Sequence, residues 1–163
     1  WLTWAVKVNW LGEFMTGLVM AAIGDITRVR TASGLWKSFG LHVDNETHMA
    51  AKLKEGVEGT IGHKFARKIL GVVRSVYFRI GAKGQGGFYY DRYLEAKHHY
   101  DEIRPDWPEG RRMGAAIRKF EKLLLSHIWE VWRKAKELPV VPPYPIAHQI
   151  GHTKIEPEEA MRG

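Results

Sequence analysis

The chain has 163 residues, of which 45% are hydrophobic and 26% are charged, a composition typical of one globular domain with its own core. Twenty-five Lys and Arg residues against 18 Asp and Glu residues give a net charge of +7 at pH 7, which favours polyanionic partners such as nucleic acid or an anionic membrane surface. The chain contains no cysteine, which excludes disulfides and thiolate zinc sites and leads us to expect a cytoplasmic protein.

The first 23 residues give two expectations about the chain as a whole. The most apolar early segment, residues 11–23, is too short to span a bilayer and contains Glu13, so we expect no membrane partner. The chain begins with Trp1 rather than Met, from which we expect a fragment that lacks its upstream part. Residues 1–10 fit either a short helix or the end of an element that begins upstream.

Apolar residues further along the chain recur at spacings of three and four, the pattern of amphipathic helices that face a core. Gly and Pro residues mark the ends of these segments, and Thr31 is placed to cap the second one. The predicted helices cover residues 13–23, 32–39, 63–80, 88–103 and 111–136. Residues 42–62 are rich in glycine and polar side chains and predict a loop or a short β-hairpin.

The C-terminal segment has a different composition, with five prolines between Pro139 and Pro157. Proline removes a backbone donor and clashes with the preceding helical turn, so we predict no helix here. The chain is therefore predicted to have a helical domain over residues 1–138 and a proline-rich, polyproline-like arm over residues 139–163. This arm is expected either to lie on the body or to reach toward a partner.

The segment 111–136 contains no proline and predicts a helix about 39 Å long. Its core-facing stripe comprises Met113, Ile117, Phe120, Leu124, Ile128, Val131 and Ala135. Further apolar side chains lie off this stripe, namely Leu123, Leu125, Trp129 and Trp132. The middle of the helix therefore needs cover from several directions, either from other helices of this chain or from a second subunit. These patterns predict a mainly α fold, a compact multi-helix domain around one long central helix.

One face of the predicted helix 63–80 is basic. Phe65, Ile69 and Val72 are expected on its core side, whereas Gly71 on the basic side leaves the backbone approachable between cations. We expect phosphates to bind this face, and the alternative is an ordinary solvated helix surface. Counting the preceding loop and the central helix, the candidate nucleic-acid-binding residues are Lys52, Lys54, Lys64, Arg67, Lys68, Arg74, Arg118, Lys119 and Lys122.

Histidines and carboxylates give no pattern for metal binding or catalysis. His148 and His152 are four apart, but Gly151 and the nearby prolines argue against the helix that this spacing would need, and we predict no metal or other cofactor in this chain. His127 is expected to be a hydrogen-bonded core residue. The acidic residues form no recognisable catalytic pair, and the sequence has no nucleophile elbow, phosphate-binding loop or dinucleotide fingerprint.

Three segments together resemble a known family. They are GLVMAAIGDITRVRTASGLWKSFGLHV at 17–43, RKFEKLLLSHIWEVWR at 118–133 and PPYPIAHQIGHTKIEPEE at 142–159. They are similar to the C-terminal transposase domain of insertion-sequence transposases of types 110, 116 and 902, in particular to archaeal-looking members. The resemblance extends over residues 10–159, and the run from Gly24 to Leu41 is its most specific part.

The resemblance implies a DNA-binding and assembly domain for transposition, with DNA and a guide RNA as partners and a possible homo-oligomer through the central helix. It also implies that Mg²⁺ binds in an upstream nuclease domain, which this chain lacks. Two motifs differ: residues 12–15 do not read Gly-Ile-Gly-Pro, and the serine nucleophile expected after Leu41 is missing. Ser75 and Thr47 remain as hydroxyl candidates, so we expect binding without catalysis by this chain alone. The alternatives are a nucleic-acid-binding helical module outside recombination and a helical oligomerisation domain.

Overall fold

The computed structural model describes residues 2–8, 11–44, 50–51, 61–143, 146–147 and 153–161. In this part of the chain the fold is mainly helical, as predicted, and each of the five predicted helices is present. The elements are α1 (Leu2–Lys7), α2 (Gly12–Ile23), the 3₁₀ helix η1 (Ile26–Arg28), α3 (Ala32–Ser38), α4 (Lys64–Gly81), α5 (Gly87–Ile103), α6 (Glu109–Ala135) and the 3₁₀ helix η2 (Pro157–Met161).

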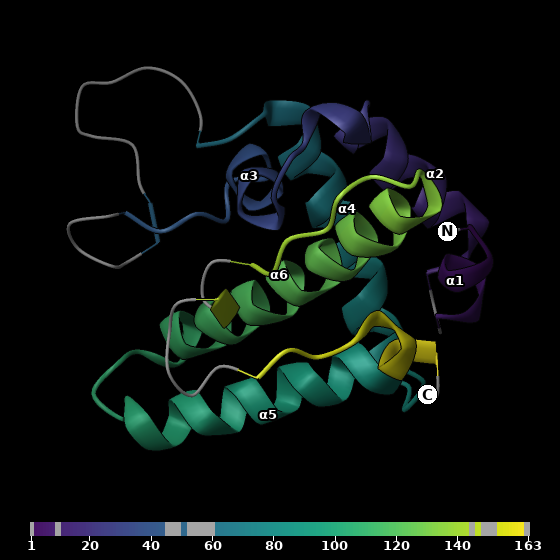
Figure 1. The fold of residues 1–163 in the computed structure, drawn as a ribbon. Coiled ribbons are helices and arrows are strands. Elements are labelled where there is room, and N and C mark those ends of the chain that lie inside the picture. The colour runs from purple at the N-terminus through teal and green to yellow at the C-terminus, as the bar shows by residue number, and fades with distance from the viewer. Residues whose placement is uncertain are drawn as a thin grey trace.

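The long helix α6 is central, with α5 along one side of it and α3 and η1 packed on another (Figure 1). Ile117, Phe120 and Leu124 of the predicted stripe are buried. Trp129, off the stripe, is also buried and donates its indole N–H to the carbonyl of Val29 over 2.8 Å. The chain itself therefore covers the middle of α6 from several directions.

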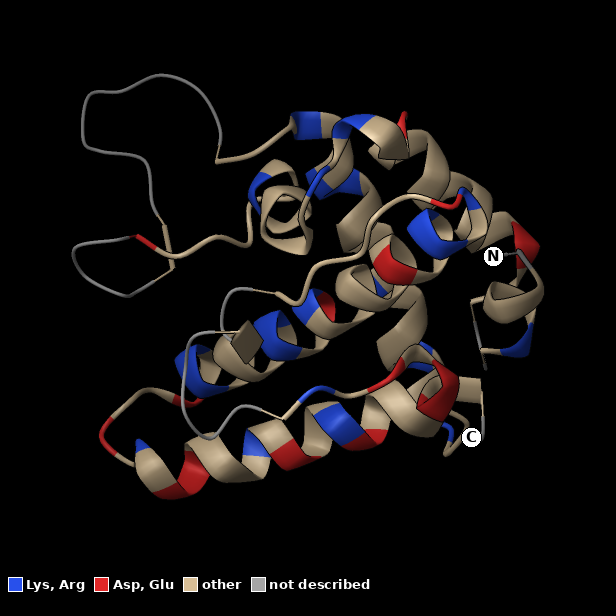
Figure 2. Cartoon of the chain, in the orientation of Figure 1, with Lys and Arg blue, Asp and Glu red and all other residues tan. Residues whose placement is uncertain are grey.

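Two residues of the predicted stripe are not in the core. Met113 is 42% exposed and Ala135 is exposed, because they lie near the two ends of a 27-residue helix. Such a helix is about 40 Å long, whereas α5 has 17 residues and spans about 26 Å. Lys and Arg positions occupy both ends of α6 (Figure 2). The stripe is buried only where other elements run beside it.

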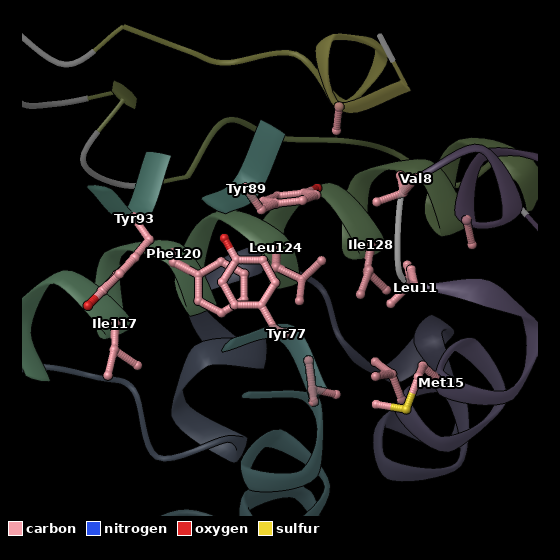
Figure 3. Close-up of a cluster of buried hydrophobic side chains, with 14 of the residues drawn as sticks. Val8, Leu11, Met15, Tyr77, Tyr89, Tyr93, Ile117, Phe120, Leu124 and Ile128 are labelled. Carbon is pink, nitrogen blue, oxygen red and sulfur yellow. The ribbon is translucent and has the colours of Figure 1, made fainter. Parts of the chain in front are cut away.

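The core face of α4 includes Ile69, as predicted, but is rotated from the predicted face. Phe65 and Val72 were expected to face the core but are 44% and 38% exposed, while Leu70 and Tyr77 are buried. The ring of Tyr77 stacks on that of Phe120, with centroids 4.1 Å apart and an interplanar angle of 8° (Figure 3). This stacked pair, whose attraction adds to the apolar area that it buries, lies on the observed core face of α4.

The described part of the C-terminal arm lies on the body, which was one of the two predicted outcomes. The exclusion of helix was wrong at η2, where Pro157 starts a 3₁₀ turn, a position at which a missing N–H costs little. The carboxylate of Glu159 accepts the backbone N–H of Glu156 at 2.9 Å and so caps this turn. Ala160 is buried in the main core, and the indole N–H of Trp4 donates to the carbonyl of Pro157 at 2.7 Å.

Val43 and Ala50 form an isolated antiparallel bridge within the segment predicted as a loop or hairpin. Most of that segment lies outside the described residues, so the choice between loop and hairpin stays a prediction. Among the helices that the structure describes, none combines the length and the apolar character that crossing a bilayer requires.

Candidate nucleic-acid interface

A cavity of about 370 Å³ lies between the end of α3, the first half of α4 and the first half of α6. Its wall contains five cations and one carboxylate, together with apolar side chains and two glycines. The lining residues are Phe39, Gly40, Leu41, Lys64, Arg67, Lys68, Leu70, Gly71, Arg74, Arg118 and Glu121. Lys and Arg positions concentrate on the first turns of α4 and along the first half of α6 (Figure 2).

A backbone contact between two glycines holds α4 against the end of α3. Gly40 and Gly62 both have positive φ angles, +73° and +75°. A Cβ on Gly62 would lie 2.5 Å from the amide nitrogen of Gly40, so only glycine permits this approach. Next to the contact, the N–H of His63 donates to the carbonyl of Ser38 at 2.7 Å. Because α4 begins at Lys64, this junction positions the cations of its first two turns at the cavity.

The carboxylate in the cavity wall belongs to Glu121, which is fully buried. Its Oε1 accepts the Nε–H of Arg74 at 2.8 Å and a second N–H of the same guanidinium. Burial raises the pKa of the Glu121 carboxyl, and Arg74 offsets this only in part. Its Oε2 is buried and has no hydrogen-bond partner among the described residues. An unsatisfied buried acceptor costs roughly 1–3 kcal/mol.

The remaining cations are not held in carboxylate ion pairs by the described residues, although the charge of Glu121 also attracts Arg118. Within the described residues, no ion pair involves Lys64, Arg67, Lys68, Arg118 or Lys122. Arg118 donates from Nη2 to the carbonyl of His42 at 3.1 Å, which fixes its position on the wall. The result is a concentrated positive potential around one hollow.

Burial, and to a lesser extent the neighbouring cations, shift the pKa values of two titratable groups near the cavity. Burial, and then the charge of Arg118, lower the pKa of Lys122 to about 8. The Nζ of Lys122 lies 5.1 Å from the centre of the Trp36 ring. Burial, and then Lys37 and Arg118, also lower the pKa of His42. A half-buried ammonium with such a lowered pKa is a site where an added anion would be stabilising.

Not all nine predicted cations gather here. Lys64, Arg67, Lys68, Arg74 and Arg118 line the cavity. Lys122 lies one helical turn after Arg118, so the two share a face of α6. Lys119 points elsewhere, with its Nζ 5.2 Å from the centre of the Tyr100 ring of α5. Lys52 and Lys54 lie outside the described residues.

The two hydroxyl candidates from the sequence are Ser75 and Thr47. Ser75 is exposed on α4, and its hydroxyl donates to the carbonyl of Gly71 at 2.9 Å, so it is next to the cavity but engaged with its own helix. Thr47 lies outside the described residues. Ser75 is thus a hydroxyl near the cavity, and its hydrogen bond is to a backbone carbonyl rather than to an acid–base side chain.

His127 is a core histidine, as predicted. Its Nε2–H donates to the carbonyl of Ile155 at 3.0 Å, so its Nδ1 accepts the hydroxyl proton of Tyr89 at 2.7 Å. In the part of the chain that the structure describes, no group of three or more His, Asp or Glu residues is arranged to hold a metal ion. His148 and His152 lie outside that part.

Glu121 is the residue of the site that sequence reasoning missed. It stands four residues after Ile117 and four before Leu125, both of which are buried, so it occupies an apolar face of α6. A carboxylate at such a position needs a cationic partner. This signal was available in the sequence, but the identity of the partner, Arg74 on another helix, was not.

No family model, curated protein sequence or solved structure matches this chain.

Proposed function

We propose that this chain is a nucleic-acid-binding domain that holds phosphates at the cavity between α3, α4 and α6. The observation that carries the proposal is the convergence of five cations from two helices on one hollow that contains a single, already paired carboxylate. Lysine and arginine side chains that converge in this way neutralise phosphates and release their condensed counterions.

The burial of Lys122 favours this function over an ordinary solvated basic surface. A solvated surface leaves each ammonium in water, where its charge costs nothing. Lys122 is instead partly buried beside Arg118, and both keep their charges close together without a carboxylate within ion-pair distance among the described residues. Keeping these two charges partly buried and close together is unfavourable in the free protein. The negative charge of a bound polyanion would offset that unfavourable free energy.

Charge reversal tests the proposal. In the variant Arg67→Glu/Lys68→Glu, we expect the affinity for a 20-bp DNA duplex to fall at least about tenfold, measured by fluorescence anisotropy. The log–log salt dependence should become shallower by about two, because two phosphate contacts are lost. The matched control is Arg79→Glu/Lys83→Glu, which makes the same charge change at the exposed end of α4 and in the turn after it; Arg79 lies about 18 Å along the helix from Arg67.

Equal loss of affinity in the two double variants would mean that only net charge matters. Binding that responds neither to these changes nor to added salt would reject the nucleic-acid function itself.

The narrower proposal, from the sequence resemblance, is that the chain is the DNA-binding and assembly domain of an insertion-sequence transposase and works in the cytoplasm. We expect the purified chain with Mg²⁺ to bind supercoiled plasmid without nicking it, because the Ser75 hydroxyl donates to the carbonyl of its own helix at Gly71 and no hydrogen bond joins it to a base among the described residues. Gel electrophoresis of the plasmid measures this. Nicking that disappears in Ser75→Ala would contradict the expectation and assign Ser75 as nucleophile.

The alternative of an oligomerisation domain rested on the apolar circumference of α6. Leu125, Trp129 and Trp132 are buried by the chain's own η1, α3 and neighbouring segments. Their burial within one copy leaves nucleic-acid binding as the better supported proposal.

A further inference from the structure

The cavity between α3, α4 and α6 is a hollow, whereas an internal phosphodiester of a nucleic acid carries a sugar on each side. Such a group can lie across the mouth of the cavity, but its two ester bonds keep it from entering. A terminal phosphate has one ester bond and three free acceptor oxygens, so it can project into a hollow of about 370 Å³. Since the inference below concerns this same cavity, it rests on the proposed function.

Three arginines of the cavity wall lie close enough to influence one another. Burial lowers the pKa of the Arg118 guanidinium; the carboxylate of Glu121 opposes this shift, whereas the charges of Arg74 and Arg67 add to it. Arg118 belongs to α6 and the other two belong to α4, so the guanidinium groups converge on the cavity from two helices. Arginines present planar sets of N–H donors that match the oxygens of a phosphate.

These guanidinium side chains are accessible from solvent. Arg67 is exposed, and the side chain of Arg74 is 44% exposed. The Cδ of Arg67 lies 3.2 Å from the position that a Cβ of Gly40 would take, so the glycine lets this side chain lie against the backbone beyond α3. Arg118 is half-buried, and its bond from Nη2 to the carbonyl of His42 uses one of five N–H donors. The cations are therefore positioned and still able to donate to a ligand.

The charge balance of the wall favours a doubly charged group. Among the described residues that line the cavity, five cations face one carboxylate, that of Glu121, which is buried and bonded to Arg74. Four positive charges are thus in excess, whereas an internal phosphodiester brings one negative charge. A terminal phosphate brings about 1.5 to 2 negative charges at pH 7, so its electrostatic attraction to this wall is stronger.

We propose that the cavity receives the terminal phosphate of a nucleic-acid strand, so that the chain binds phosphorylated ends in preference to the interior of a duplex. The phosphate oxygens accept N–H groups of Arg67 and Arg118, and Arg74 contributes its charge beside them. Lys64 and Lys68, which are exposed on the same wall, bind the next phosphodiester of that strand. Terminal phosphates at the 5′ and the 3′ end share this chemistry, and the test separates them.

The test compares DNA duplexes of one sequence by fluorescence anisotropy: a 20-bp duplex with hydroxyl ends, the same duplex with one 5′-phosphate, and the same duplex with one 3′-phosphate. A duplex one base pair longer with hydroxyl ends is the charge control, because it adds two phosphodiesters and so a similar negative charge. We expect at least one phosphorylated duplex to bind about tenfold more tightly than the charge control. The end that gives the larger gain is the end that the site holds.

Removal of single arginines tests the location. Arg118→Gln and Arg67→Gln should each remove most of this preference, while salt-dependent binding to the hydroxyl-ended duplex persists at lower affinity through the remaining cations. Arg67 is exposed, so its variant keeps the test decisive if circular dichroism shows that Arg118→Gln does not fold. The matched control is Arg111→Gln on α6, because the Arg111 guanidinium lies 4.0 Å from the centre of the Trp107 ring and not in the cavity wall. This control should keep the full preference.

Two outcomes overturn the inference while the proposed function stands. One is salt-dependent binding in which neither phosphorylated duplex binds more tightly than the charge control. The other is a preference for a phosphorylated end that is unchanged in both Arg67→Gln and Arg118→Gln. Loss of salt-dependent binding to every duplex in the unmodified protein would instead reject the proposed function, on which the inference depends.

Discussion

At the scale of single residues, the basic face of α4 contains cations with two different roles. Arg74 is engaged with the buried Glu121, and removing one member of such a pair costs about 3–5 kcal/mol when the other is left buried and charged. Arg74 is 44% exposed while Glu121 is fully buried, so loss of the arginine is the more damaging change. Lys64, Arg67 and Lys68 have no such partner among the described residues and are free to bind phosphate.

The lowered pKa of Lys122 gives a prediction for the pH dependence of binding. Phosphate binds the protonated amine, and Lys122 loses its proton as the pH rises through about 8 in the free protein. Nucleic-acid affinity should therefore fall about tenfold between pH 7 and pH 9. His42 does not contribute in this range, because its lowered pKa leaves it neutral above pH 7.

Anisotropy titrations across this range measure the effect. Lys122→Arg should bind with little pH dependence, because arginine stays charged. Lys119→Arg on the neighbouring face of α6 is the control and should behave like the unmodified protein. Parallel pH profiles for Lys122→Arg and the unmodified protein would remove Lys122 from the interface.

At the scale of elements, the junction between α3 and α4 decides whether the cavity exists. The helices meet through backbone atoms, since Gly40 and Gly62 approach without side chains and His63 donates to Ser38. Trp36 ties α3 to the central helix as well, because its indole N–H donates to the carbonyl of Lys122 at 3.1 Å. These contacts fix α3 relative to both helices that carry the cations.

Two alanine substitutions separate backbone strain from this close approach. Gly84→Ala introduces alanine at φ +74° in open space and should cost about 1 kcal/mol of unfolding free energy. Gly62→Ala adds the same strain and a Cβ 2.5 Å from the backbone of Gly40, so it should cost roughly 3 kcal/mol or more.

Urea unfolding followed by circular dichroism measures both values. Nucleic-acid affinity should fall in Gly62→Ala and stay unchanged in Gly84→Ala, because only the first displaces α4 from α3. Similar stability and affinity in the two variants would show that the junction is not rigid.

At the scale of the whole molecule, the C-terminal arm fastens the N-terminal helix to the central one. Trp4 of α1 binds the carbonyl of Pro157, and His127 of α6 binds the carbonyl of Ile155. Lys154 reaches Glu130 of α6 at 2.9 Å. These contacts of the arm with α6, at His127 and Glu130, lie beyond Glu121, the last cavity residue of α6, so they support the core away from the candidate site.

The buried His127 makes stability depend on pH. Burial lowers its pKa to about 4 in the folded chain, against 6.5 for an ordinary histidine. The unfolded chain therefore binds more protons between these values. The stabilisation that depends on a neutral His127 is fully present above pH 6.5. It is lost as the pH falls toward 4, and the free energy of unfolding decreases by roughly 3 kcal/mol in total.

Urea unfolding at pH 7 and pH 4.5 checks this prediction. His127→Gln should be less stable than the unmodified protein at pH 7 but should lose less stability on acidification. His98→Gln is the control, because His98 is exposed, and its pH dependence should match that of the unmodified protein. An unchanged pH dependence in His127→Gln would contradict the assigned role.

The sequence by itself determined the mainly helical fold, the positions of the helices and the central place of α6, because the spacing of apolar residues and the Gly and Pro boundaries are local properties. It also placed Lys64, Arg67 and Lys68 on one face of α4. Only the tertiary structure decided that Arg118 joins them while Lys119 turns toward Tyr100, because residues one position apart on a helix differ in direction by about 100°. The rotation of α4 and the buried pair of Arg74 with Glu121 likewise depend on packing between helices distant in sequence, which no local pattern specifies.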